Sequence, residues 1–82
     1  MTKNELLPAL LIIARDVTGE DDLDFNRDTL FEKIEEWDSM NHVHMVVRME
    51  KEFGVHFEDA VRLQSAVKVG DLLDYIADLK GL

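Results

Sequence analysis

Cysteine is absent from this chain of 82 residues, and proline and glycine are scarce, with one and four residues respectively. Without cysteine the protein can form neither disulfides nor thiolate metal sites, so apolar packing alone must hold the fold, as is usual inside the cell. Basic side chains are also few, nine against eighteen acidic ones, and the net charge is -9. Nucleic-acid binding requires clustered Lys and Arg, so we exclude it and expect partners with basic surfaces.

Long hydrophobic runs are missing as well. No apolar stretch approaches the roughly 20 residues of a membrane span. The amino-terminal sequence MTKNELLPALLIIARD contains acidic residues and no small-residue cleavage pattern, so it does not read as a signal peptide. We therefore expect a cytoplasmic protein that forms one domain over residues 1–82, with no feature that demands an oligomer and too little mass for an elaborate enclosed active site.

Apolar residues recur at helical spacing in three longer segments. Residues 3–17 form the first, although its start is ambiguous, because Thr2 and Glu5 have the spacing of a capping box while Pro8 then lies inside the helix, where fraying or a kink is expected. Its apolar stripe consists of Leu6, Leu7, Leu10, Leu11, Ala14 and Val17.

The second and third long helices are expected at residues 39–53, ending at Gly54, and at residues 69–79. Residues 58–63 allow one short helix between them. The last helix carries a stripe of Val69, Leu72, Leu73, Ile76 and Leu79, with Asp71, Asp74 and Asp78 outside it. Since no alternating strand pattern occurs, the predicted fold is all-α: a four-helix bundle of three long helices and a short third one.

Residues 18–37 are predicted to form a long connection with one helical turn. A connection of this length in a small domain is usually functional or is held down by its own apolar side chains. Phe25, Leu30 and Phe31 are the candidates for that role.

The predicted helix at 39–53 has two apolar faces. Met45, Val46, Met49 and Phe53 form the face expected in the core, whereas Met40, Val43 and Val47 form another. Asn41, His44, Arg48, Lys51 and Glu52 make up the polar strip that remains. The helix is either central to the bundle or exposes its second face; because a bundle of three long helices gives each at most two neighbours, we expect Met40, Val43 and Val47 to form a partly exposed interaction surface.

Asp38 and Ser39 stand at a boundary of charge. Residues 1–38 carry 11 acidic and 4 basic side chains, whereas residues 39–68 carry 4 of each. Either residue of the pair can cap the helix that follows, but capping needs only one of them. No histidine or lysine occupies the usual place of a base that would activate the serine.

The segment WDSMNHVHMVVRMEKEFGV, residues 37–55, resembles the acyl carrier protein family, whose members have Asp-Ser-Leu at the start of an apolar helix. The acidic loop containing LFEKI and the later VGDLLDYI extend the resemblance over nearly the whole chain. It implies a bundle of acyl-carrier type in which a phosphopantetheinyl transferase attaches 4′-phosphopantetheine from coenzyme A to Ser39. The thiol of that arm then holds acyl or aminoacyl groups as thioesters.

The resemblance also implies roles and partners. The protein is a carrier without catalytic activity of its own, and Asp38 contributes to recognition by the modifying enzyme. An acyl-loading ligase or transferase and downstream acyl-transfer or condensing enzymes of lipid, fatty acid or secondary-metabolite biosynthesis are the expected partners. The residues predicted to contact them are Met40, Asn41, Val43, His44, Val47 and Arg48.

Three departures point to a specialised stand-alone carrier. Met40 replaces the usual Leu, Glu36 and Trp37 stand where fatty-acid carriers have small residues, and the polar strip carries Arg48 and Lys51 where those carriers are strongly acidic. Trp37 either alters how the arm leaves the surface or covers the loop. Met45 and Met49 are core residues first, and adaptable lining if the interior admits an acyl chain.

Other readings are weaker. His42 and His44 point about 200° apart on a helix and cannot share a metal ion, so no metal site is predicted. Hydrolysis through Ser39 would need His56 brought back from a loop. The main alternative is an unmodified acidic helical interaction domain that uses Met40, Val43 and Val47 and in which Ser39 is only a cap.

Overall fold

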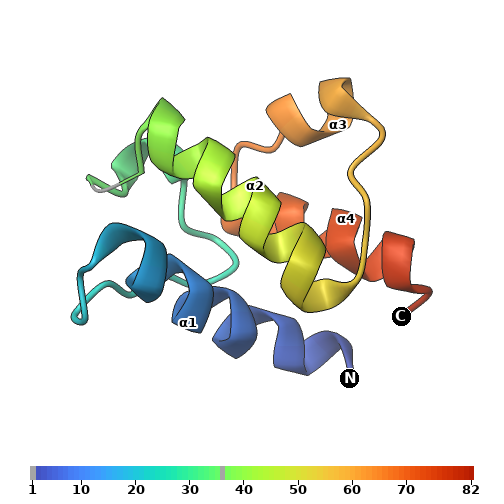
Figure 1. The fold of residues 1–82 in the computed structure, drawn as a ribbon, viewed down its shortest axis with the longest axis horizontal. Helices are drawn as coiled ribbons and strands as arrows, with labels where there is room; N and C mark the ends of the chain where they lie inside the picture. The colour runs from blue at the N-terminus through green and yellow to red at the C-terminus, as the bar shows by residue number, and fades with distance from the viewer. Residues whose placement is uncertain (1, 36) are drawn as a thin grey trace.

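The computed structural model describes residues 2–35 and 37–82, and the side chains of Ser39 and Ala60 lie outside what it describes. Within those ranges the chain is all-helical, and four α-helices pack around one core (Figure 1). Their bounds are Leu6–Thr18 for α1, Ser39–Phe53 for α2, Ala60–Gln64 for α3 and Val69–Lys80 for α4. The predicted all-α bundle with a short third helix is confirmed. Glu36, one of the residues that distinguish the chain from fatty-acid carriers, lies outside the described residues.

A short 3₁₀ turn resolves the ambiguity at the start of the first helix. The turn η1 spans Lys3–Glu5, and the Thr2 amide donates to the Glu5 carboxylate at 3.0 Å. The α-helix begins only at Leu6, so Pro8 falls in its first turn, where a missing N–H costs no intrahelical hydrogen bond. The capping pair and the proline therefore coexist without a proline in the helix interior.

Helix α2 has the bounds that its sequence predicts. Asp38 is the N-cap residue, and Gly54 ends the helix in the left-handed conformation with φ 65°. Met45 and Met49 are fully buried, and Phe53 is buried beside them. This face holds the helix against the core. The second apolar face stays outside it.

Helix α4 buries two residues in addition to its predicted stripe and leaves one residue of that stripe exposed. Tyr75 and Ala77 join the predicted stripe in the core, whereas Leu79 is 40% exposed. Leu79 lies in the last turn of the helix, next to its end at Lys80. Asp71 accepts from the amides of Lys68 and Val67, contacts that lower the pKa of its carboxyl and fix the start of α4.

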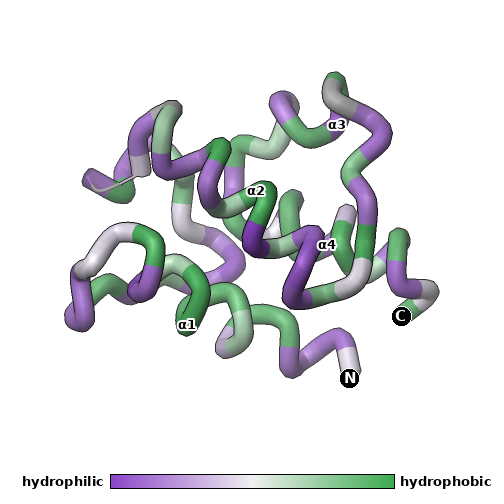
Figure 2. The backbone as a smooth tube through the Cα atoms, in the orientation of Figure 1, coloured by the Kyte–Doolittle hydropathy of each residue, from purple (hydrophilic) through white to green (hydrophobic). Residues whose placement is uncertain are grey.

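The long connection between α1 and α2 is held down by its own apolar side chains. Leu23, Phe25 and Ile34 are buried, and the single turn η2 spans Phe31–Lys33. Figure 2 shows the change of character, from a mostly apolar α1 to the hydrophilic turn that follows it. Phe25 has the predicted role, while Leu30 and Phe31 are only half-buried.

The same connection pairs with the segment between α3 and α4. The Phe31 amide donates to the Val67 carbonyl at 3.0 Å, and the Val69 amide donates to the Thr29 carbonyl at 2.9 Å. The two segments come very close at Gly70, where an added Cβ atom would lie 2.9 Å from the Arg27 carbonyl oxygen. The absence of a side chain at residue 70 therefore lets the two segments meet.

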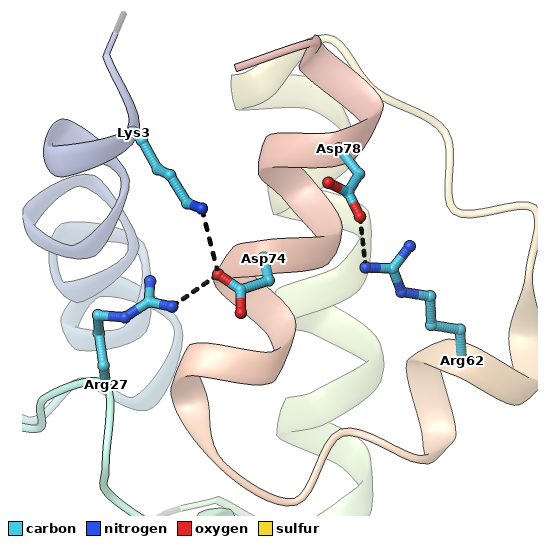
Figure 3. Close-up of polar contacts among 5 residues, drawn as sticks. All are labelled: Lys3, Arg27, Arg62, Asp74 and Asp78. Atoms are coloured by element: carbon cyan, nitrogen blue, oxygen red, sulfur yellow. Dashed lines mark hydrogen bonds and ion pairs between the residues drawn. The ribbon is translucent and has the colours of Figure 1, made fainter.

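Polar contacts tie the smaller elements to α4 (Figure 3). Asp74 pairs with Arg27 of the connection at 2.6 Å and with Lys3 of η1 at 3.8 Å. Further along α4, Asp78 pairs with Arg62 of α3 at 2.6 Å. Helix α4 is thus an anchor for both the connection and α3. No helix in the described residues is long and apolar enough to cross a membrane.

Candidate functional site

The start of α2 is built by Asp38. Its carboxylate accepts a hydrogen bond from the Asn41 amide at 2.8 Å, and its carbonyl accepts from the His42 amide at 2.9 Å. Asp38 is therefore the cap, and residue 39 is the first residue of the helix proper. Since the cap is already supplied, the fold does not require residue 39 to act as one. The predicted role of the Ser39 side chain lies outside what the structure describes.

A groove of about 440 Å³ opens beside this helix start. Asp38, His42 and Val43 form its α2 side, and largely apolar residues form the rest. These are Phe31, Trp37, Leu63, Gln64 and Ala66. Met45 and Met49 belong to the fully buried core, so the groove has a different lining from the one that the sequence suggests for an acyl chain.

Trp37 and His42 join the loop to the helix. The Trp37 indole N–H donates to His42 Nδ1 at 3.1 Å, and the Trp37 ring lies 4.8 Å from Phe31 and 6.4 Å from Phe25, measured between centroids. Burial lowers the pKa of the His42 imidazole, which favours its neutral form. Trp37 thus covers the loop and lines the groove at the same time.

The second face of α2 is exposed as predicted. Met40 is 70% exposed, and Val43 and Val47 are each 59% exposed. His44 is also exposed, whereas Asn41 and Arg48 are half-buried. Arg48 pairs with Asp16 of α1 and with Glu52, and the hydrogen bond to Asp16 raises the pKa of its guanidinium. Arg48, one of the six residues predicted to contact partners, therefore also links α1 to α2.

His56 and His42 each have a partner that is already given by the structure. His56 Nδ1 lies 2.9 Å from a Glu50 carboxylate oxygen, beyond the far end of α2. His42 Nδ1 accepts from an indole N–H, so its proton resides on Nε2 and the ring has no free lone pair with which to act as a base. Among the described residues there is no cluster suited to a metal ion.

Comparison with known proteins shows which family the chain belongs to. The family described as "Phosphopantetheine attachment site" matches residues 8–76. A protein named acyl carrier protein from Acidothermus cellulolyticus is 33% identical over 78 residues, which cover 95% of this chain and 92% of the relative. The chain belongs to the acyl carrier protein family. Membership implies a covalently attached 4′-phosphopantetheine and a carrier role beside a phosphopantetheinyl transferase and acyl-processing enzymes, and it favours this role over the unmodified interaction domain.

The geometry of this acyl carrier protein family member fits the cofactor. The helix start offers the positive end of the α2 dipole, which suits the phosphate. The adjoining groove is open and largely apolar. The residues that surround the helix start are thus compatible with a phosphopantetheine bound there.

The sequence did not predict that His42 bonds to Trp37 and lines the groove. It also did not predict the residues on the far side of the groove. A signal for the first existed: Trp37 precedes the cap and His42 is the fourth residue of the helix, which is the spacing of a hydrophobic staple. Leu63, Gln64 and Ala66 carry no comparable pattern, because they reach the groove only through the packing of α3.

Proposed function

We propose that Ser39 carries the phosphopantetheine arm and that residues 1–82 form a single, specialised carrier domain. The supporting observation is that Asp38 caps α2 by itself, so residue 39 begins the helix beside the groove with no capping duty. The match over 92% of the relative's length supports the assignment of residues 1–82 to one carrier domain. When bound, the arm supplies a thiol on a flexible chain, which holds an acyl or aminoacyl group as a thioester.

The chain's own residues then divide the work. Asp38 fixes the first turn of the helix and presents its carboxylate to the modifying enzyme. Met40, Val43 and Val47 offer an apolar surface to the transferase, to an acyl-loading ligase or transferase and to condensing enzymes of fatty acid, other lipid or secondary-metabolite biosynthesis. Asn41, His44 and Arg48 flank that surface. No residue has to act as a base, since the modifying enzyme activates the serine.

Intact mass tests the attachment. The protein and Ser39→Ala are incubated with coenzyme A, magnesium and a broad-specificity phosphopantetheinyl transferase. We expect one phosphopantetheine on the unchanged protein and none on the variant. Failure of several transferases to modify a helical, folded protein, or modification of Ser39→Ala, would refute the assignment.

A matched pair of variants tests the docking surface. Val43 and Ile12 are both exposed, at 59% and 68%, but Ile12 belongs to α1 and lies outside the proposed surface. Val43→Ser should raise the apparent KM for modification about tenfold, the effect of losing about 1.4 kcal/mol of binding. Ile12→Ser should leave it unchanged. Equal KM values for the two variants would show that the transferase does not use this face.

A further inference from the structure

The hydrogen bond between Trp37 and His42 fixes the chemistry of the imidazole. An indole N–H can only donate, so His42 Nδ1, 3.1 Å away, must present its lone pair. The ring is therefore neutral and carries its proton on Nε2. Protonation of Nδ1 would place two donors against each other and break the bond.

The loop holds this pair in place. Trp37 packs on Phe31 with centroids 4.8 Å apart and meets the edge of the buried Phe25 at 6.4 Å. The two partner rings, Trp37 and His42, have centroids 6.0 Å apart. The indole is held by two aromatic neighbours, so its N–H has a fixed direction. It therefore determines the tautomer of His42, and the orientation of the indole does not depend on that tautomer.

The remaining polar atom of the imidazole is Nε2–H, on a ring that lines the groove beside the helix start. In the described part of the chain, the His42 imidazole has a hydrogen bond at Nδ1 and none at Nε2. His42 follows residue 39 by three positions, a spacing that puts two Cβ atoms about 5–6 Å apart on neighbouring positions of one helix face. Residue 42 and the proposed point of attachment therefore lie on the same face of α2.

Few charged groups surround this donor. Asp38, which lines the same groove, is the titratable neighbour on its own element, and its carboxylate already accepts from the Asn41 amide. The elements across the groove contribute Phe31, Leu63, Gln64 and Ala66, none of which titrates. An anion at this position would thus find two kinds of side-chain donor, the His42 imidazole and the Gln64 amide, beside one carboxylate.

We propose that His42 is a positioning residue for the phosphodiester of the arm, donating from Nε2 to a phosphate oxygen while Trp37 keeps it in the required tautomer. This inference rests on the proposed attachment at Ser39. It gives Trp37 a function in addition to covering the loop. It also assigns distinct roles to the two nearby histidines, since His42 lines the groove whereas His44 lines a separate hollow with Val17 and Val47.

NMR titration of the histidines provides the test, with His44 as the internal control. The pKa values of His42 and His44 are measured in the unmodified protein, in the phosphopantetheinylated protein and in Ser39→Ala after the same incubation. Modification should raise the pKa of His42 by about one unit or more, as a nearby opposite charge does. The pKa of His44 should change far less, and Ser39→Ala should match the unmodified protein.

Two variants examine the positioning itself. In the modified protein the phosphorus-31 resonance should titrate with the pKa of His42, and His42→Gln should remove that titration. Trp37→Phe keeps an aromatic ring but lacks the N–H, so nitrogen-15 shifts of His42 should change from a single Nε2–H tautomer to a mixture.

The outcomes separate the two proposals. A correct mass gain with equal pKa changes at His42 and His44 would overturn the positioning role and leave the carrier function intact. Absence of any mass gain at Ser39 would overturn both. A His42 that already populates both tautomers in the unmodified protein would refute the selection by Trp37.

Discussion

At the scale of single residues, Gly70 shows how the absence of one carbon atom shapes the molecule. Alanine is about 1 kcal/mol better than glycine in a helix, so Gly70→Ala would stabilise α4 if space allowed. Here the added Cβ would meet the Arg27 carbonyl oxygen at 2.9 Å. We expect a net loss of about 1–3 kcal/mol, typical of overpacking, and a fall in Tm of at least about 4 °C.

Thermal unfolding followed by circular dichroism measures this change. The direction of the change in Tm distinguishes overpacking from helix propensity, because helix propensity alone predicts a higher Tm. A more stable Gly70→Ala protein would mean that the pairing between residues 27–31 and 67–70 yields at little cost.

Asp38 combines two roles that one substitution separates. Asparagine caps helices as well as aspartate does, so Asp38→Asn should keep the hydrogen bond to the Asn41 amide and change Tm by no more than about 2 °C. If the carboxylate serves the transferase, the rate of modification should still fall about tenfold or more. Asp38→Ala, which loses the cap as well, is the comparison. A normal modification rate for Asp38→Asn would restrict the residue to its structural role.

At the scale of elements, α3 is the shortest of the four α-helices. It has five residues, and its contacts with α4 include the Arg62–Asp78 ion pair at 2.6 Å and the Arg62 guanidinium 4.6 Å from the centre of the Tyr75 ring. The Tyr75 hydroxyl also accepts a hydrogen bond from the Asp59 amide at 2.9 Å. Since Leu63 and Gln64 of α3 line the groove, these contacts help to place that side of it.

Arg62→Gln should therefore loosen α3 alone. We expect hydrogen exchange at residues 61–64 to accelerate about fivefold, while amides in α2 and α4 remain protected. Lys3→Gln is the matched control, because it also removes an exposed partner of an α4 aspartate but leaves α3 untouched. Equal exchange in the two variants would show that Arg62 does not hold the helix.

The elements differ in how far their sequence predicts them. The bounds of α2 follow from local signals, a capping aspartate before it and Gly54 after it, and its two apolar faces follow from helical spacing. Pairing between residues 27–31 and 67–70 leaves no such signal, because each hydrogen bond joins segments far apart in the chain. The groove also leaves no local signal in the sequence, because its lining residues come from segments far apart in the chain. Asp38 and Ser39 were identified as a motif, but the residues facing them come from the loop and from α3.

At the scale of the whole molecule, charge should limit stability. The chain has a net charge of -9, and its longest dimension is 30 Å. Raising the ionic strength from about 0.01 M to about 0.15 M shortens the Debye length from about 30 Å to about 8 Å, so repulsion across the molecule becomes screened. We expect Tm to rise by about 4–8 °C, equivalent to about 1 kcal/mol. An unchanged Tm would mean that the ion pairs of Arg27, Arg48 and Arg62 already balance the repulsion.

The direction of α2 relative to the two ends of the chain has a practical consequence. The start of η1 and the end of α4 both lie toward the carboxyl end of α2, where Lys80 donates to the Phe53 carbonyl at 2.8 Å, whereas Asp38 stands at the opposite end of the helix (Figure 1). The fifteen residues of α2 separate these points by about 22 Å at 1.5 Å per residue. A tether, label or solid support joined to either terminus would therefore leave the helix start facing outward, so the protein can be immobilised in one orientation without obstructing enzymes that approach from solution.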